Sequence, residues 1–261
     1  MRPPAIVAAI AVFALLAGAA KAQDSDESQM GAQLYKEMVA QREVVATTPL
    51  YQVLKPIADA ISRAAEPRYH APIHFYIVHS SEPNAFAAPG GNIYVIDSLM
   101  YFVHNREELA GTLCHETSHL IHHDSVKELD NDEAIREREL IGMILLGPSV
   151  GTAVAASAVG KLDSMHFSRE AEESADLTGA DTCAAAGLNP WGLVWLFRDF
   201  SSANMKTPPE ILSDHPNNQH RIEALEAHFK SDPARFARFS SDPKTATALR
   251  LPRNEAEAFL K

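Results

Sequence analysis

Residues 115–119 are His-Glu-Thr-Ser-His, which is the pattern H-E-x-x-H. On an α-helix, two residues four apart lie about 40° apart around the axis and one turn along it. His115 and His119 would therefore project from one face of a helix and could hold one Zn²⁺ ion at two tetrahedral positions. Glu116 follows the first histidine, where its carboxylate could act as the general base in peptide hydrolysis.

The residues before this pattern favour a helix. Asn105 is a good N-cap residue, and Glu107 and Glu108 would lie in the first turn, where negative charge suits the positive end of a helix. We expect the helix to run to about Asp124. A polar surface helix with two unrelated histidines would show the same pattern, so residues elsewhere in the chain must distinguish the two interpretations.

A hydrolytic zinc site needs a third protein ligand and one open position. Glu172 and Asp176 lie four apart in a helix predicted from Ser168 to Ala186, so they would share a face. Glu172 could bind the metal, while Asp176 could accept a hydrogen bond from a ligand histidine and fix its tautomer. A solvated acidic face is the alternative, but the upstream H-E-x-x-H pattern favours the metal site.

The chain before the motif predicts two helical segments and paired strands. The pattern from Asp24 to about Glu66 is helical, with a new start at Thr48-Pro49. Short β-rich runs follow at 73–78 and 92–97, and Gly90-Gly91 suits a tight turn between strands.

After the motif, residues 140–159 are almost all small or apolar, but glycines and a proline interrupt them. A buried helical hairpin or an active-site cover is the favoured interpretation, with membrane-surface contact and a true span as alternatives. Further helices are predicted at 190–200 and 217–229, and the segment after Ser231 is polar with short helical pieces.

The composition limits the classes of partner. The chain has 261 residues and a net charge of −11, with 46% hydrophobic and 22% charged residues, as in ordinary globular proteins. We expect no nucleic-acid partner, because no basic stripe is present to neutralise phosphates.

The N-terminus resembles a signal peptide. Arg2 precedes an apolar run from Ala5 to Ala17, and Ala20-Lys21-Ala22 suits signal peptidase. We therefore expect residues 1–22 to be removed on export, most simply to the periplasm, with membrane association or an uncleaved anchor as alternatives. The remaining chain would comprise a metallopeptidase domain at 23–230 and a polar tail at 231–261.

Two cysteines, Cys114 and Cys183, would then enter an oxidising compartment. Either one disulfide or two buried thiols fits the sequence. Neither cysteine has a second one at close metal-ligand spacing.

With these pieces in order, the chain resembles the HtpX-like and CAAX-prenyl-protease-like zinc metallopeptidases (peptidase family M forty-eight), and in particular their small exported bacterial branch. H-E-x-x-H occurs in many families, but the ordered set of motifs is far more specific. The matching pieces are Asn84-Ala85-Phe86-Ala87 with Pro89-Gly90-Gly91, the H-E-x-x-H helix, Ser168-Arg169 leading to Glu172 and Asp176, and His215-Pro216 followed by Arg221-Ile222.

The resemblance implies an α+β, mainly helical fold of the gluzincin type, with a small twisted sheet beside the active-site helix. It implies one Zn²⁺ per chain, bound by His115, His119 and Glu172, with Glu116 as catalyst. It also implies that His215 and Arg221 take part in catalysis. The alternative is that these two residues only have an ordinary structural role at the start of a helix. Two positions depart from the family pattern without removing a ligand: Ser174 replaces a glutamate and Asp124 a histidine.

The resemblance further implies that residues 92–97 form an edge strand on which an extended substrate pairs. The contact residues would be Asn92, Ile93, Tyr94 and Val95. Backbone pairing tolerates many sequences, as the degradation of misfolded chains requires.

The sequence thus predicts a zinc endopeptidase of the cell envelope that degrades misfolded or damaged proteins. Its partners would be unfolded polypeptides, with membrane-surface contact through 140–159 as a further expectation. One alternative is a zinc-retaining chaperone or assembly factor for envelope proteins with little turnover. Another is a zinc hydrolase acting on small molecules, although such ligands need no long strand-pairing groove.

Overall fold

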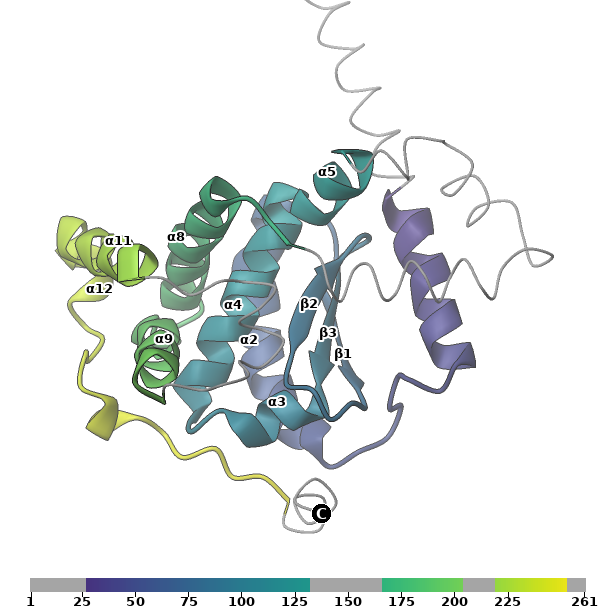
Figure 1. The fold of residues 1–261 in the computed structure, drawn as a ribbon, viewed down its shortest axis with the longest axis horizontal. Coiled ribbons are helices and arrows are strands. Elements are labelled where there is room, and N and C mark those ends of the chain that lie inside the picture. The colour runs from purple at the N-terminus through teal and green to yellow at the C-terminus, as the bar shows by residue number, and fades with distance from the viewer. Residues whose placement is uncertain (1–26, 132–165, 204–218, 253–261) are drawn as a thin grey trace, which may run out of the picture.

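The structure is a computed structural model that describes residues 27–131, 166–203 and 219–252 (Figure 1). In this part of the chain helices surround one small sheet, so the predicted mainly helical α+β fold is confirmed. The helices are α2 (Leu50–Tyr69), α3 (Asp97–Phe102), α4 (Arg106–His122), α5 (Asp124–Asn131), α8 (Arg169–Ala185), α9 (Trp191–Ala203), α11 (Gln219–Ser231), α12 (Pro233–Phe236) and the 3-10 helix η1 (Pro243–Thr245), preceded by a helix at 27–40.

The sheet contains β1 (His74–Val78), β2 (Ala85–Ala88) and β3 (Asn92–Ile96) in the order β1-β3-β2. β1 pairs with β3 in parallel, and β2 pairs with β3 antiparallel. The predicted tight turn between β2 and β3 is confirmed, with φ of 77° at Gly90 and 79° at Gly91, a conformation that glycine adopts without strain.

The prediction that residues 92–97 form an edge strand is wrong. Asn92, Ile93, Tyr94 and Val95 all lie in β3, whose two neighbours already pair with it. The physical reason is that β1 and β2 do not pair with each other, and the tight turn after β2 brings β3 back between them. The order of strands along the chain therefore differs from their order in the sheet.

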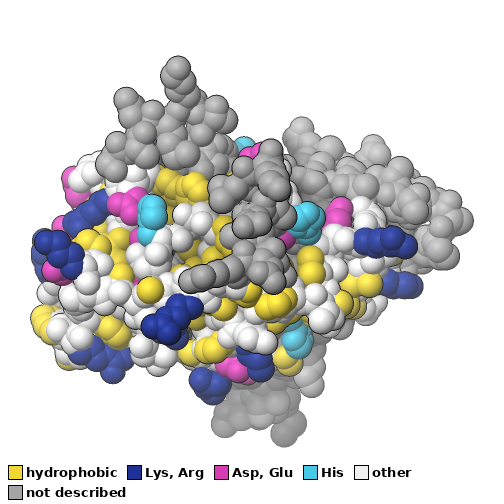
Figure 2. Space-filling model, turned by 90° about the horizontal axis from the view of Figure 1, so that it is seen from below, with side chains coloured by type: hydrophobic (Ala, Val, Ile, Leu, Met, Phe, Trp, Pro, Cys, Tyr) yellow, Lys and Arg dark blue, Asp and Glu magenta, His cyan; other side chains and the backbone are white. Residues whose placement is uncertain are grey.

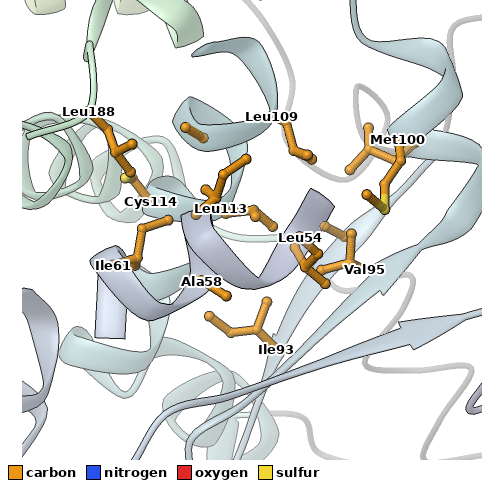
Figure 3. Close-up of a cluster of buried hydrophobic side chains, with 14 of the residues drawn as sticks. Leu54, Ala58, Ile61, Ile93, Val95, Met100, Leu109, Leu113, Cys114 and Leu188 are labelled. Atoms are coloured by element: carbon orange, nitrogen blue, oxygen red, sulfur yellow. The ribbon is translucent and has the colours of Figure 1, made fainter. Parts of the chain in front are cut away.

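Side chains along β3 alternate between two apolar clusters, one on each face of the sheet. Ile93 and Val95 pack with α2 and α4 in the largest apolar cluster, part of which is drawn in Figure 3. Tyr94 and Ile96 face the other way, into a second cluster with residues of the helix at 27–40. Both faces of β3 are therefore buried, as expected for the middle strand of a covered sheet.

Helix α4 lies between the sheet and the pair α8 and α9 (Figure 1). It begins as predicted, because the Asn105 side chain accepts a hydrogen bond from the amide of Glu108 at 2.9 Å. Glycines allow the helices to approach closely. A Cβ atom on Gly192 of α9 would overlap the carbonyl of Glu107, and one on Gly179 of α8 would lie 3.1 Å from the backbone of Cys114.

The segment after Ser231 contains the expected short helices and packs against the helical layer. Phe236 of α12 is 2% exposed and belongs to an apolar cluster with α8, α9 and α11. Trp195 Nε1 donates to the carbonyl of Ser241 at 3.0 Å, and the amide of Thr247 donates to Glu107 at 2.8 Å. This segment therefore covers α9 and passes beside the start of α4.

Charged side chains of both signs lie among apolar ones on the face shown in Figure 2. Within the described ranges, no helix combines the length and the apolar character needed to cross a membrane. The predicted signal peptide at 1–22, the apolar segment at 140–159 and His215 lie outside the described residues.

Candidate metal centre

The structure brings His115 and His119 of α4 together with Glu172 of α8. One ligand atom from each lies within 4.8 Å of the other two, and all three residues are buried. Nε2 of His115 lies 3.1 Å from Nε2 of His119. Each of these nitrogens lies 3.5 Å from an oxygen of Glu172. The three ligands expected from sequence therefore converge on one point.

A disulfide fixes the two helices that carry these ligands. Cys114, next to His115 on α4, is bonded to Cys183 on α8, with 5.8 Å between their Cα atoms. Both sulfurs are buried among the apolar residues between the helices. The sequence left a disulfide and two free thiols open, and the structure contains the disulfide.

Each of the two histidines has an aspartate beside its Nδ1. Nδ1 of His115 lies 3.0 Å from Asp176, and Nδ1 of His119 lies 2.9 Å from Asp124. Ionised carboxylates only accept hydrogen bonds, so each Nδ1 carries the proton and each Nε2 presents a lone pair to the centre. The part expected for Asp176 from sequence agrees with this contact.

This donor set fits a small divalent cation. Two lone pairs 3.1 Å apart and a carboxylate beside them would repel one another unless positive charge lies between them. Ligands bonded at about 2.0 Å in a tetrahedron lie about 3.3 Å apart, close to the observed separations. The fourth tetrahedral position is not taken by these three residues, which is the arrangement of a catalytic site.

Without a cation, the surroundings treat the two imidazoles differently. Burial lowers the pKa of His115, in spite of Asp176 and Glu172. Burial acts in the same direction on His119, but the hydrogen bonds to Asp124 and Glu172 outweigh it and raise its pKa to about 9. A metal ion must therefore displace a proton from the imidazole of His119 in order to bind.

Asp124 is a further acidic side chain at the centre, and it stands where the family pattern has a histidine. His123 ends α4 in a left-handed conformation with φ of 54°, and this turn brings Asp124 back onto His119. Helical spacing gave no signal for it, because the pair is five apart and spans the helix end.

Arg221 of α11, for which the family resemblance implies a catalytic part, contacts the two acidic side chains of α8 behind the centre. Its Nε and Nη2 each donate to Asp176 at 2.7 Å, and Nη1 lies 2.8 Å from Glu172. The side chain is 3% exposed and lies over the ring of Phe197. Burial acts to raise the pKa of Asp176, but Arg221 and His115 hold it below its usual range. Arg221 therefore keeps this carboxylate ionised and holds the Glu172 carboxylate in place.

The strand nearest to Glu116 is β2, not β3. Oε2 of Glu116 accepts a hydrogen bond from the amide of Ala87 at 3.1 Å. The hydroxyl of Ser125 donates to the carbonyl of the same residue at 2.8 Å. Ala87 thus presents its outward backbone groups to the site, on the edge of the sheet opposite to β1.

One further residue near the centre had no signal in the sequence. The ring of Phe167 stacks on that of His119 with 4.1 Å between centroids. It comes from the segment immediately before α8, and so it is brought to the centre by the same helix that carries Glu172.

Comparisons with known proteins agree with this geometry. The model of Peptidase family M48 matches residues 46–228. The beta-barrel assembly-enhancing protease of Escherichia coli strain K12 is 26% identical over 208 residues, which cover 75% of this chain and 42% of the relative. The protein of the same name from Yersinia pestis is 24% identical over 206 residues, with the same coverage. The mitochondrial metalloendopeptidase OMA1 of Schizosaccharomyces pombe is 26% identical over 209 residues, 77% of this chain and 60% of the relative. The chain thus spans less than half of the length of the first two relatives.

Proposed function

This chain belongs to peptidase family M48 and carries a metallopeptidase domain, and from that premise we propose that it is a zinc-dependent endopeptidase of the cell envelope. The observation that carries the proposal is the convergence of His115, His119 and Glu172 on one point, with Glu116 on the same helix. Imidazole and carboxylate ligands with one open position are the usual set of hydrolytic zinc.

A bound zinc ion would polarise the scissile carbonyl and lower the pKa of water at the centre. Glu116 takes a proton from the attacking water and delivers it to the leaving amine. Asp176 and Asp124 hold the ligand histidines in the tautomer that leaves each Nε2 available. Arg221 keeps Glu172 oriented toward the two imidazoles.

The proposed substrates are unfolded or misfolded polypeptides of the envelope. The printed name of the bacterial relatives, beta-barrel assembly-enhancing protease, supports work on envelope proteins. The disulfide supports an oxidising location such as the periplasm. Membrane-surface contact through 140–159 remains part of the proposal.

Extended substrates would pair with β2, the edge strand beside Glu116. In the structure, the outward amide and carbonyl of Ala87 are bonded to Glu116 and Ser125. Pairing therefore requires a substrate backbone to exchange with these two side chains. Such backbone pairing is insensitive to sequence, which suits a protease of damaged chains.

A zinc-retaining assembly factor with little turnover is the second candidate, and the assembly-related name of the relatives favours it. The two candidates differ in what Glu116 does. In an assembly factor the metal centre would only stabilise the fold. A protease also requires the carboxylate of Glu116 as a general base.

The decisive variant is Glu116→Gln, which removes the base but no expected metal ligand. We expect the purified protein to digest casein, a chelator to stop digestion, and Glu116→Gln to retain zinc without cleaving. Glu173→Gln is the matched control, because this exposed glutamate lies beside Glu172 but outside the cluster, and it should keep both zinc and activity.

Other results would reject the protease. Full cleavage by Glu116→Gln would show that Glu116 is not the catalytic base. Zinc binding without digestion by the wild type, together with suppressed aggregation of an unfolded client, would favour the assembly factor.

A further inference from the structure

A second group of metal-binding side chains lies at the opposite end of α4. His104 precedes the N-cap of α4, Glu108 lies in its first turn, and Asp199 belongs to α9. One ligand atom from each lies within 4.8 Å of the other two. Nδ1 of His104 lies 3.5 Å from Oε2 of Glu108 and 3.2 Å from Oδ2 of Asp199.

This group is separate from the catalytic centre. Glu108 and His115 are seven residues apart on one helix, which corresponds to about 10 Å along the axis. Two metal ions that act on one substrate lie about 3.5–4 Å apart. An ion at the start of α4 would therefore not form a two-metal catalytic pair with the ion at His115.

The charges of the group favour a divalent cation. Glu108 is 1% exposed and is held by the side chain of Asn105 at 2.5 Å and by the backbone amide of His104 at 2.7 Å. Two ionised carboxylates carry two negative charges at a partly buried position. A divalent ion bound between them would cancel this charge, which lowers the cost of burying Glu108.

The ion could enter from solvent without any opening of the fold. The side chains of His104 and Asp199 are 71% and 49% exposed, while that of Glu108 forms the floor of the group. Water would complete the coordination. One imidazole nitrogen with two carboxylates is a ligand set that suits Zn²⁺ better than Mg²⁺ or Ca²⁺, which prefer oxygen alone.

We propose that His104, Glu108 and Asp199 form a second zinc site with a structural role, which ties α9 to the beginning of the helix that carries the catalytic centre. The C-terminal segment also passes there, since Thr247 bonds to Glu107 and Ala248 forms a bridge with Asn105. The ion would thus stabilise a junction of three segments that are distant in the sequence.

The test is the zinc content of the purified mature chain, measured by plasma mass spectrometry after dialysis against Zn²⁺. The wild type should hold two ions per chain, and both His104→Ala and Asp199→Asn should hold one. Titration of the stripped protein with Zn²⁺ should show two affinities, of which these variants weaken only one, by roughly tenfold or more. Both residues are exposed, so neither variant should fail to fold.

His220→Ala is the matched control. His220 is an exposed histidine that faces one carboxylate, Glu173, at 3.7 Å, but it does not belong to a three-ligand group among the described residues. This variant should keep both ions. The proposal is wrong if His104→Ala and Asp199→Asn bind as many zinc ions as the wild type. The protease proposal is tested separately, by the zinc content and the activity of Glu116→Gln.

Discussion

Asp124 accepts a hydrogen bond from Nδ1 of His119 at 2.9 Å, although α4 ends between the two residues. The left-handed turn at His123 makes this contact possible. With Asp176 on His115, each ligand histidine has its own carboxylate, one from the next helix along the chain and one from α8.

Asp124→Asn should weaken zinc binding by about 10- to 100-fold, because an amide neither stabilises the imidazole of His119 as well nor fixes its tautomer. Competition with a zinc-binding dye measures the change. Asp59→Asn removes a carboxylate that is 44% exposed and paired with Lys55 on α2, so it serves as the control with unchanged affinity. Equal affinity in Asp124→Asn and the wild type would contradict the role assigned to Asp124.

Arg221→Met should lower the free energy of unfolding of the metal-free chain by about 3–5 kcal/mol, because it leaves the buried Asp176 carboxylate without its bidentate partner. Arg221→Lys should also destabilise, since an ammonium group cannot reproduce two parallel hydrogen bonds. Urea unfolding in the presence of a chelator measures both variants.

The control for this prediction is Arg198→Met. Arg198 is 47% exposed and bonds to Glu226 on the surface, so its loss should cost no more than about 1 kcal/mol. If Arg221→Met abolished cleavage while the unfolding free energy stayed unchanged, the guanidinium would have a direct catalytic part, and the positioning role would be rejected.

Replacing both Cys114 and Cys183 by alanine should lower the unfolding free energy by about 4 kcal/mol, the chain-entropy value for a closed loop of this length. The disulfide spans 69 residues and joins the two helices that carry the metal ligands. We therefore expect weaker zinc binding as well. Urea unfolding and zinc titration measure both effects, and the wild type with and without a reductant provides a second comparison. Identical curves with and without the disulfide would contradict the stabilising role of the disulfide.

The stability that Asp181 contributes should vanish in acid. Burial acts to raise its pKa, but Arg235 and His228 outweigh it and lower the pKa below its ordinary value of 3.8. A carboxyl with a lowered folded-state pKa stabilises the fold above about pH 4, and this contribution is lost as pH falls through the lowered value. Asp181 joins α8 to both α11 and α12.

Asp181→Asn should therefore be less stable than the wild type at neutral pH, and the difference should shrink as the pH falls below about 4. Thermal unfolding at a series of pH values measures it. A difference that stays constant down to the lowest pH would show that the charge of Asp181 does not contribute.

Residues close together in sequence determined the centre of the site. The positions of His115, Glu116 and His119 follow from the period of the α-helix, and so does the common face of Glu172 and Asp176. The cap at Asn105 and the glycine turn before β3 likewise depend on local backbone chemistry. The sequence by itself therefore determined which residues share the candidate site and which helices carry them.

Only the tertiary structure decided how distant elements meet. It placed β3 in the middle of the sheet, brought Arg221 onto Asp176 and Glu172, and paired Cys114 with Cys183. These contacts join segments separated by loops and by other helices, and no periodicity within one element encodes them. They depend on which faces pack together when the whole core is buried, and that is a property of the complete fold.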